Sequence, residues 1–146
     1  MFERILICTD GTPLSNKAVD SGIALAAKLS AEVIAFMVVP HYPAMYFEGA
    51  MVLTPAETQR IETEWNGQAQ SVVDAVKKDA TARGVKATSA TGHGAVAESI
   101  ISAAKKHHCD LIVMASHGRK GISRVLLGSE TTHVLTHSHI PVLVLR

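Results

Sequence analysis

The residues best suited to bind a ligand form a basic, glycine-spaced segment near the C-terminal end of the chain. Between His117 and Ser129 the sequence holds three cationic side chains, three glycines and no acidic residue. Glycines let a backbone approach an anion closely, and the free N–H groups at a helix start favour phosphate. The segment therefore indicates a polyphosphate site. The residues leave open the alternative of an exposed loop with turn glycines, in which Ser129 is the N-cap of a helix.

Asp10 is the second candidate ligand group, because it stands two residues after the apolar run from Ile5 to Cys8, at the end of the first predicted strand. A carboxylate at a strand end could accept hydrogen bonds from ribose hydroxyls or hold a metal that bridges to phosphate. The alternative is a turn in which Asp10 caps nearby backbone before the helix expected after Pro13. The segment matches neither GxGxxG nor a P-loop, which disfavours dinucleotide binding of the Rossmann kind and P-loop nucleotide hydrolysis.

Five segments have the patterns of strands. Four are continuous apolar runs, typical of strands covered on both faces: 5–8, 32–39, 111–114 and 142–145. Val85 to Thr91 is half polar and is predicted as an edge strand.

Four segments between these strands have helical patterns: 13–29, 54–83, 95–107 and 129–137. Thr54 to Glu57 is a capping box with proline at the first helical position, and Gly84 marks the end of that helix. Asn66-Gly67 either breaks the helix or costs it about 1 kcal/mol.

Strict alternation of strands and helices predicts an α/β fold. We expect a single domain over residues 1–146 with a Rossmann-like, doubly wound, five-stranded parallel sheet and helices on both faces. Such sheets bind ligands beyond the carboxyl ends of their strands, where the strand order reverses. Both candidate segments follow strands and are expected at that edge.

Composition limits the class of function. The formal net charge is +1, which gives no broad attraction to nucleic acid or to an anionic membrane. Two cysteines without a CxxC pair fit a reducing compartment. No signal peptide and no apolar run of membrane-spanning length is visible. These features predict a soluble cytoplasmic protein.

The opening segment 5–15 and, more closely, the closing segment 110–146 resemble universal stress proteins. ATP-binding members of that family have the pattern G-x2-G-x9-G-[ST]. Here the pattern is Ala115, Gly118, Gly128 and Ser129, with the nine-residue gap intact and alanine in place of the first glycine. The family also has members that lack these glycines and bind no ATP. The resemblance implies an adenine nucleotide alpha hydrolase-like fold, and the motif places this chain with the ATP-binding members.

Roles for individual residues follow from the resemblance alone. It implies that Thr9 and Val38 line an adenine pocket, with the Val38 backbone reading the base edge, and that Asp10 contacts ribose or a metal. The residues expected along the sugar and phosphates are Met114, Ala115, Gly118, Arg119, Lys120, Gly128, Ser129 and Thr131. Glu130 lies beside them and would oppose phosphate unless its side chain points away or reaches a metal. The implied ligand is ATP, with Mg²⁺ or Mn²⁺ as a candidate cation.

Ala115 leads to a quantitative expectation. If the family glycine has a positive φ, alanine costs of order 1 kcal/mol there, which is somewhat less than a tenfold loss of affinity. On that assumption ATP binding is weakened but present, and Ala115→Gly raises the affinity modestly.

Three functions remain open at this stage. The first is an ATP-binding stress or regulatory protein that acts on an unidentified client, with slow ATP hydrolysis or phosphate transfer at most. The second is a nucleotide-free dimeric interaction module of the same fold. The third, a dedicated enzyme, lacks a recognisable nucleophile–base pair. The resemblance suggests a homodimer formed through the last strand, 141–146, whose apolar edge would otherwise be open.

Overall fold

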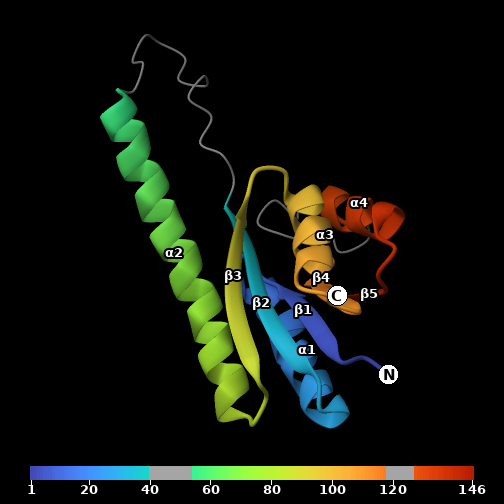
Figure 1. The fold of residues 1–146 in the computed structure, drawn as a ribbon. Helices are drawn as coiled ribbons and strands as arrows, with labels where there is room; N and C mark the ends of the chain where they lie inside the picture. Colours follow the sequence, from blue (N-terminus) through green and yellow to red (C-terminus); the bar gives the residue numbers. More distant parts are fainter. Residues whose placement is uncertain (40–53, 118–126) are drawn as a thin grey trace.

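The computed structural model describes residues 1–39, 54–117 and 127–146 (Figure 1). Strands and helices alternate along these residues. In chain order they are β1 (Arg4–Cys8), α1 (Pro13–Leu29), β2 (Glu32–Val39), α2 (Pro55–Ala82), β3 (Ala87–His93), α3 (Val96–Lys106), β4 (Leu111–Ala115), α4 (Ser129–His137) and β5 (Val142–Leu145).

The five strands form one parallel sheet in the order β3-β2-β1-β4-β5. The chain starts in the middle at β1, moves outward through β2 to β3, and then returns to the other side of β1 with β4 and β5. The strand order therefore reverses between β1 and β4, which is the switch point where such sheets bind ligands. The predicted fold class and the edge position of β3 are confirmed.

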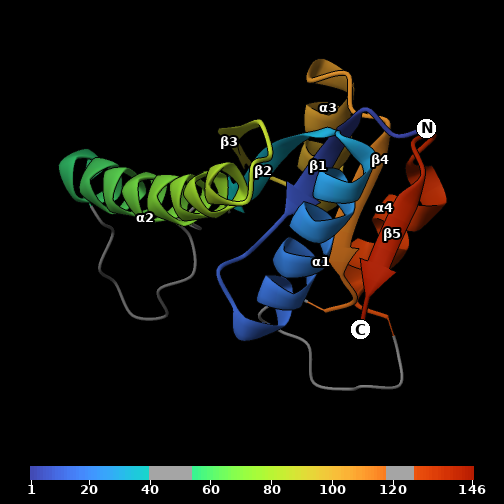
Figure 2. The same ribbon diagram turned by 90° about the horizontal axis from the view of Figure 1, so that it is seen from below.

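Helices cover both faces of the sheet (Figure 2). On one face α1 and α2 bury a cluster that includes Ile7, Ile23 and Val73. On the other face α3 and α4 bury a cluster that includes Ile112 and Val134. Successive strand residues alternate between the two clusters, which is why the central strands are continuous apolar runs.

The expected second helix is confirmed at both ends. The Thr54 N–H donates to Glu57 Oε2 at 2.7 Å and the Glu57 N–H donates to Thr54 Oγ1 at 3.2 Å, which completes the capping box. The helix ends just before Gly84, whose φ is +77°. It continues unbroken through Asn66-Gly67, and Asn66 Oδ1 lies 2.6 Å from His93 Nε2 at the end of β3.

The edge strand is displaced from its predicted range. It runs from Ala87 to His93 rather than from Val85 to Thr91. The Val85 N–H donates to the Ala80 carbonyl at 2.9 Å and so closes the turn that follows α2. Val85 is therefore part of the helix-to-strand turn, and strand pairing starts two residues later at Ala87, opposite Val33.

Candidate functional site

The carboxyl ends of β1 and β4 lie side by side at the switch point. Ile7 pairs with Val113 in the parallel register, so the segments that follow Cys8 and Ala115 leave the sheet at the same edge. Helix α1 begins at this edge after Thr12, and α4 begins there after Gly128. Two helix N-termini therefore lie near the ends of two adjacent central strands, an arrangement that favours an anionic ligand.

The start of α4 is fixed to the end of β4 by hydrogen bonds. The Gly128 N–H donates to the Ser116 carbonyl at 2.8 Å, and Thr131 Oγ1 donates to the carbonyls of Ala115 and Ser116, both at 3.1 Å. The first bond within the helix runs from the Thr132 N–H to the Gly128 carbonyl at 2.9 Å. Helix geometry gives the N–H groups of residues 129–131 no partner inside α4, so these groups can bind an anion.

The N-cap of α4 is Gly128, so the expectation that Ser129 caps this helix is wrong. Residue 128 is extended, with φ −61° and ψ 151°, and no side chain makes a cap hydrogen bond. A Cβ added at this position would lie 3.0 Å from the Ser116 carbonyl oxygen. Glycine is therefore favoured by the close approach of the two backbone segments, and Ser129 is already the first helical residue.

Asp10 makes the turn that the sequence left as an alternative. Its Oδ1 accepts hydrogen bonds from the Thr12 N–H at 3.0 Å and from Thr12 Oγ1 at 2.5 Å. Thr12 in turn is the N-cap of α1, and its hydroxyl accepts from the Ser15 N–H. The carboxylate thus stabilises the start of α1. It also lies at the carboxyl edge of the sheet by the switch point, where a ligand is expected and which we call the ligand edge. The turn is therefore compatible with a role of Asp10 in ligand binding.

Thr9 is buried, and its hydroxyl is used inside the same loop. Thr9 Oγ1 accepts from the Gly11 N–H at 3.1 Å and lies 3.0 Å from Ser15 Oγ. Ser15 Oγ donates to the Thr12 carbonyl at 2.9 Å, so the hydroxyl proton of Thr9 is the one that bridges Thr9 and Ser15. The Thr9 hydroxyl therefore supports the loop, and that Thr9 lines an adenine pocket stays a prediction.

Val38 presents its backbone at the ligand edge. The ladder between β1 and β2 ends with the Thr9 N–H donating to the Phe36 carbonyl at 2.9 Å. Peptide groups alternate along a strand, so those of Val38 point to the same side as those of Phe36. They therefore point past the last paired residue of β1, which is compatible with a backbone contact to a base.

Met114 and Ala115 are both buried in β4, on opposite faces of the sheet. Met114 belongs to the cluster under α3 and α4, and Ala115 to the cluster under α1 and α2. Ala115 is paired with Leu145 in the regular strand register. The only non-glycine residues with positive φ in the described part of the chain are Ser30 and His108. Ala115 therefore lacks the positive φ on which the expected loss of ATP affinity depended.

Glu130 contacts the first turn of α3 rather than capping its own helix. Its Oε2 accepts a hydrogen bond from the Ala97 N–H, in the first turn of α3, at 3.0 Å. The acidic side chain is thus held by the first turn of α3. Sequence reasoning allowed an acid here if its side chain points away from the phosphates or reaches a metal, and this contact is compatible with the first of these; the role of Glu130 at the site stays a prediction.

Three predicted site residues, Gly118, Arg119 and Lys120, lie outside the described residues. Sequence reasoning also missed one residue, Ser116. It is buried at the end of β4, and its carbonyl accepts both the Gly128 N–H and the Thr131 hydroxyl. The contribution is made by the main chain, so only its position directly after the strand could have indicated it.

The thiol nearest the site, that of Cys8, is unreactive. Cys8 is buried at the end of β1, and burial raises the pKa of its thiol far above the ordinary range. A neutral thiol is a poor nucleophile and a poor metal ligand. Among the described residues no group of three or more His, Cys, Asp or Glu side chains could hold a metal ion. A cation at Asp10 would therefore need phosphate oxygens or water as its other ligands.

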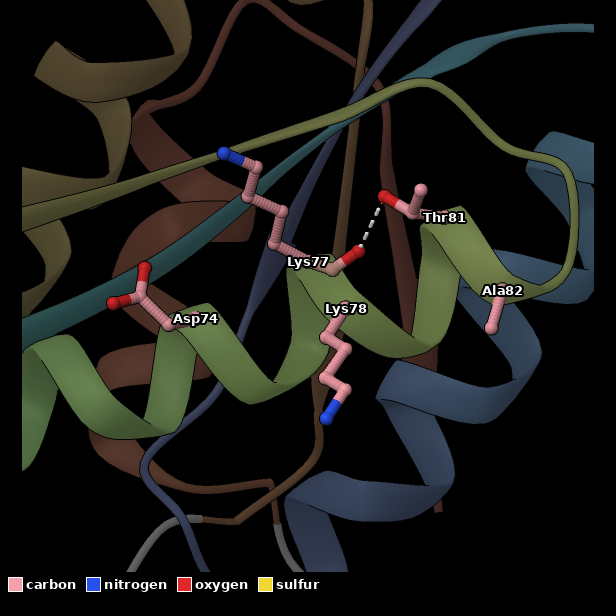
Figure 3. A pocket seen from close by; sticks show the side chains of 5 residues that line it. All are labelled: Asp74, Lys77, Lys78, Thr81 and Ala82. Carbon is pink, nitrogen blue, oxygen red and sulfur yellow. Dashed lines mark hydrogen bonds between the residues drawn. The ribbon is translucent and has the colours of Figure 1, made fainter.

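Two hollows lie along α2. A cavity of about 210 Å³ opens at the ligand edge between β2 and α2, lined by Gly11, Met37, Val39, Trp65, Gln68, Ala69 and Val72. A larger hollow of about 600 Å³ is lined only by α2 residues, Asp74, Lys77, Lys78, Thr81 and Ala82 (Figure 3). Most of the second set belongs to the last turns of α2, near the amino ends of the strands, so that hollow is not part of the site.

The family is shown by comparison with known proteins. A model of the universal stress protein family matches residues 1–146. The universal stress protein MJ0531 of Methanocaldococcus jannaschii is 35% identical over 148 residues, covering 100% of this chain and 83% of that protein. The chain belongs to the universal stress protein family.

Solved structures show the same fold. The structure of MJ0577, also from Methanocaldococcus jannaschii, has a TM-score of 0.85 at 26% identity and is covered to 96%, with 99% of this chain aligned. A universal stress protein in complex with cAMP has a TM-score of 0.67 at 23% identity, covering 99% of this chain and 97% of that one. No helix in the described residues is long and apolar enough to cross a membrane.

Proposed function

We propose that this protein is a cytoplasmic, ATP-binding regulatory protein whose nucleotide occupancy changes its interaction with a client. One observation carries the proposal: the N-terminus of α4 is held by Gly128 and Ser116 at the switch point, next to the loop that contains Asp10. The N–H groups of residues 129–131 suit phosphates, Asp10 suits ribose, and the Val38 backbone suits the base edge. A related fold in complex with cAMP supports an adenine nucleotide as the ligand.

Two basic residues outside the described ranges also support phosphate binding. Arg119 and Lys120 stand between His117 and Gly128 in the sequence, so the chain that links β4 to α4 is basic. We expect them to contribute to phosphate binding through charge, which is sensitive to salt. Replacing either residue by alanine should weaken the binding of ATP more than the binding of adenosine, because adenosine lacks the phosphates.

The direct test is the nucleotide content and affinity of the purified protein. We expect adenine nucleotide to be released on denaturation and identified by chromatography, and calorimetry of nucleotide-free protein to show ATP binding. Adenosine is the matched ligand without phosphates and should bind more weakly. If neither ATP nor cAMP binds to stripped, folded protein, the proposed function is wrong.

Mg²⁺ or Mn²⁺ is the proposed cation, held by Asp10 together with phosphate oxygens. Asp10 Oδ1 already accepts two hydrogen bonds from Thr12, so the cation would share the carboxylate with the turn. The chemistry that a cation would supply is neutralisation of phosphate charge. Calorimetry with Mg²⁺ and with a chelator separates ATP binding that needs the cation from binding that does not.

We also propose a homodimer formed through β5. This strand is at the edge of the sheet, and Leu143 at its centre is 38% exposed although it is a large apolar residue. An open apolar edge favours pairing with another strand, and a two-fold axis would let two copies cover each other. Sedimentation at tens of micromolar tests this, and a monomer there would exclude the dimer.

The alternative is a nucleotide-free interaction module of the same fold. The side chains of Asp10 and Thr9 both make hydrogen bonds inside their own loop, which favours a structural role for that loop. The two functions differ in one measurement, because only the first requires ATP to bind to the stripped protein. Dimer formation would be common to both.

A further inference from the structure

Glu130 caps a helix other than its own. It is the second residue of α4, and its Oε2 accepts from the N–H of Ala97, the second residue of α3, 33 positions earlier in the chain. The N-cap residue of α3 is Ala95, which makes no side-chain cap hydrogen bond. An alanine side chain has no hydrogen-bond acceptor, so the Ala97 N–H in the first turn of α3 receives its side-chain acceptor from α4.

The two helices are joined a second time further along. Glu98 Oε1 of α3 lies 3.3 Å from His133 Nε2 of α4, and both side chains are substantially exposed. Each helix thus contributes one carboxylate to the other. The Glu130 carboxylate also lies at the positive end of the α3 dipole, where an anion is favoured. The hydrogen bond from the Ala97 N–H fixes the direction of the Glu130 side chain.

We propose that Glu130 is a positioning residue of the nucleotide site, which holds the N–H groups at the start of α4 in place by capping α3. The cap has two consequences. It joins the first turn of α4 to α3 as well as to β4, so the N–H groups of residues 129–131 are fixed from two sides. It also directs the negative charge of Glu130 toward α3 and away from the phosphates. The inference rests on the proposed function.

The test uses three substitutions at this position. Glu130→Gln keeps the acceptor and removes the charge, whereas Glu130→Ala removes both. Glu130→Asp keeps the charge but shortens the reach to Ala97. Two quantities are measured for each: the dissociation constant for ATP by calorimetry, with Mg²⁺ and with a chelator, and the hydrogen exchange of the Ala97 amide in nucleotide-free protein.

A positioning role predicts a specific pattern. Glu130→Gln keeps the Ala97 amide protected and binds ATP about as tightly or up to about threefold tighter, because a like charge near the phosphates has gone. Glu130→Ala and Glu130→Asp lose the protection of Ala97 and bind ATP about fivefold more weakly, since the start of α4 is less well fixed. The rank order is the same with and without Mg²⁺.

Glu98→Gln is the matched control, because it removes a carboxylate from the same helix pair without touching the Ala97 N–H. It should leave both the protection of Ala97 and the ATP affinity within about twofold of the parent.

Three results would overturn the proposal. If Glu130→Gln binds ATP more weakly than the parent with Mg²⁺ present but not in chelator, Glu130 is a cation ligand. Parent-like affinity in Glu130→Ala after loss of Ala97 protection would make the cap purely structural. If the unsubstituted protein protects the Ala97 amide from exchange but binds no ATP, the proposed function is wrong, and so is the positioning role. If Glu130→Ala does not fold, Glu130→Asp and Glu130→Gln still separate these outcomes.

Discussion

Replacing Ala115 by glycine tests whether this motif position acts on the ligand or on the fold. In the ATP-binding family pattern glycine stands here, and strain relief would predict tighter ATP binding. The structure places Ala115 in regular strand conformation, paired with Leu145, and the residue is 8% exposed in the cluster under α1 and α2. Its methyl group therefore packs in the core, and glycine has no strain to relieve.

The magnitude follows from two contributions. Glycine inside a strand costs about 0.5–1 kcal/mol in backbone entropy relative to alanine. Loss of one buried methyl group costs about 0.8 kcal/mol. We expect Ala115→Gly to lower the free energy of unfolding by about 1.5 kcal/mol, the sum of these. The ATP dissociation constant should stay within about twofold, or about 0.4 kcal/mol.

The matched control is Ala35→Gly. Ala35 is 0% exposed on the same face of the sheet, in the middle of β2, away from the strand ends. It should lose similar stability in urea denaturation and likewise leave ATP affinity unchanged. A tenfold gain in ATP affinity for Ala115→Gly alone would refute this reasoning, since it would show that residue 115 contacts the ligand or is strained in the bound state.

Four further predictions concern the edge of the sheet, the thiols and β5. Asp10→Asn keeps an acceptor for the turn and should lose ATP affinity with little change in thermal unfolding, whereas Asp10→Ala should lose both; equal ATP affinity in all three proteins would leave only the turn role. Gly128→Ala brings a Cβ to 3.0 Å from a carbonyl oxygen and should cost about 1–3 kcal/mol of stability and weaken ATP in calorimetry, and a neutral result would exclude the close approach. Burial raises the pKa of Cys109 to about 11 and that of Cys8 further, so both thiols stay protonated in the folded protein at pH values where the unfolded chain loses those protons. The free energy of unfolding should therefore fall as pH rises above about 8.5, and less steeply in a variant with both cysteines replaced by alanine. Leu143→Lys should shift sedimentation toward monomer while the circular dichroism spectrum is kept, and an unchanged dimer would place the interface elsewhere.

The sequence predicted the fold well because the relevant signals are local. Continuous apolar runs marked the central strands, and the Thr54–Glu57 capping box and Gly84 marked both ends of α2. The errors were local too. Val85 has a strand-forming side chain, but its N–H is used by the turn to Ala80. Asn66-Gly67 is a turn signal in isolation, yet contacts of α2 with the sheet keep the helix continuous.

The arrangement of the site was only partly predictable. Sequence pattern placed Asp10 and Gly128 at the correct edge, because strand ends of a parallel sheet coincide. It could not show that Glu130 points to Ala97, since that contact joins residues 33 positions apart. It also could not decide whether Ala115 has the positive φ allowed for a family glycine, because φ at one residue depends on strand pairing that a motif does not contain.

The hydrogen bonds of the two acids argue that phosphate binding depends more on the protein's own donors than on a cation. Asp10 accepts from the Thr12 N–H and Glu130 accepts from the Ala97 N–H, so both carboxylates are stabilised by backbone donors of the protein itself. Phosphate would meet the N-terminus of α4 without displacing either contact. A cation at Asp10 would share the carboxylate with the hydrogen bonds from Thr12, so Asp10 is a weaker cation ligand than a carboxylate without those donors. Removing Mg²⁺ should therefore change ATP affinity less than removing the basic side chains does, which a comparison of calorimetry in chelator with the Arg119→Ala variant decides.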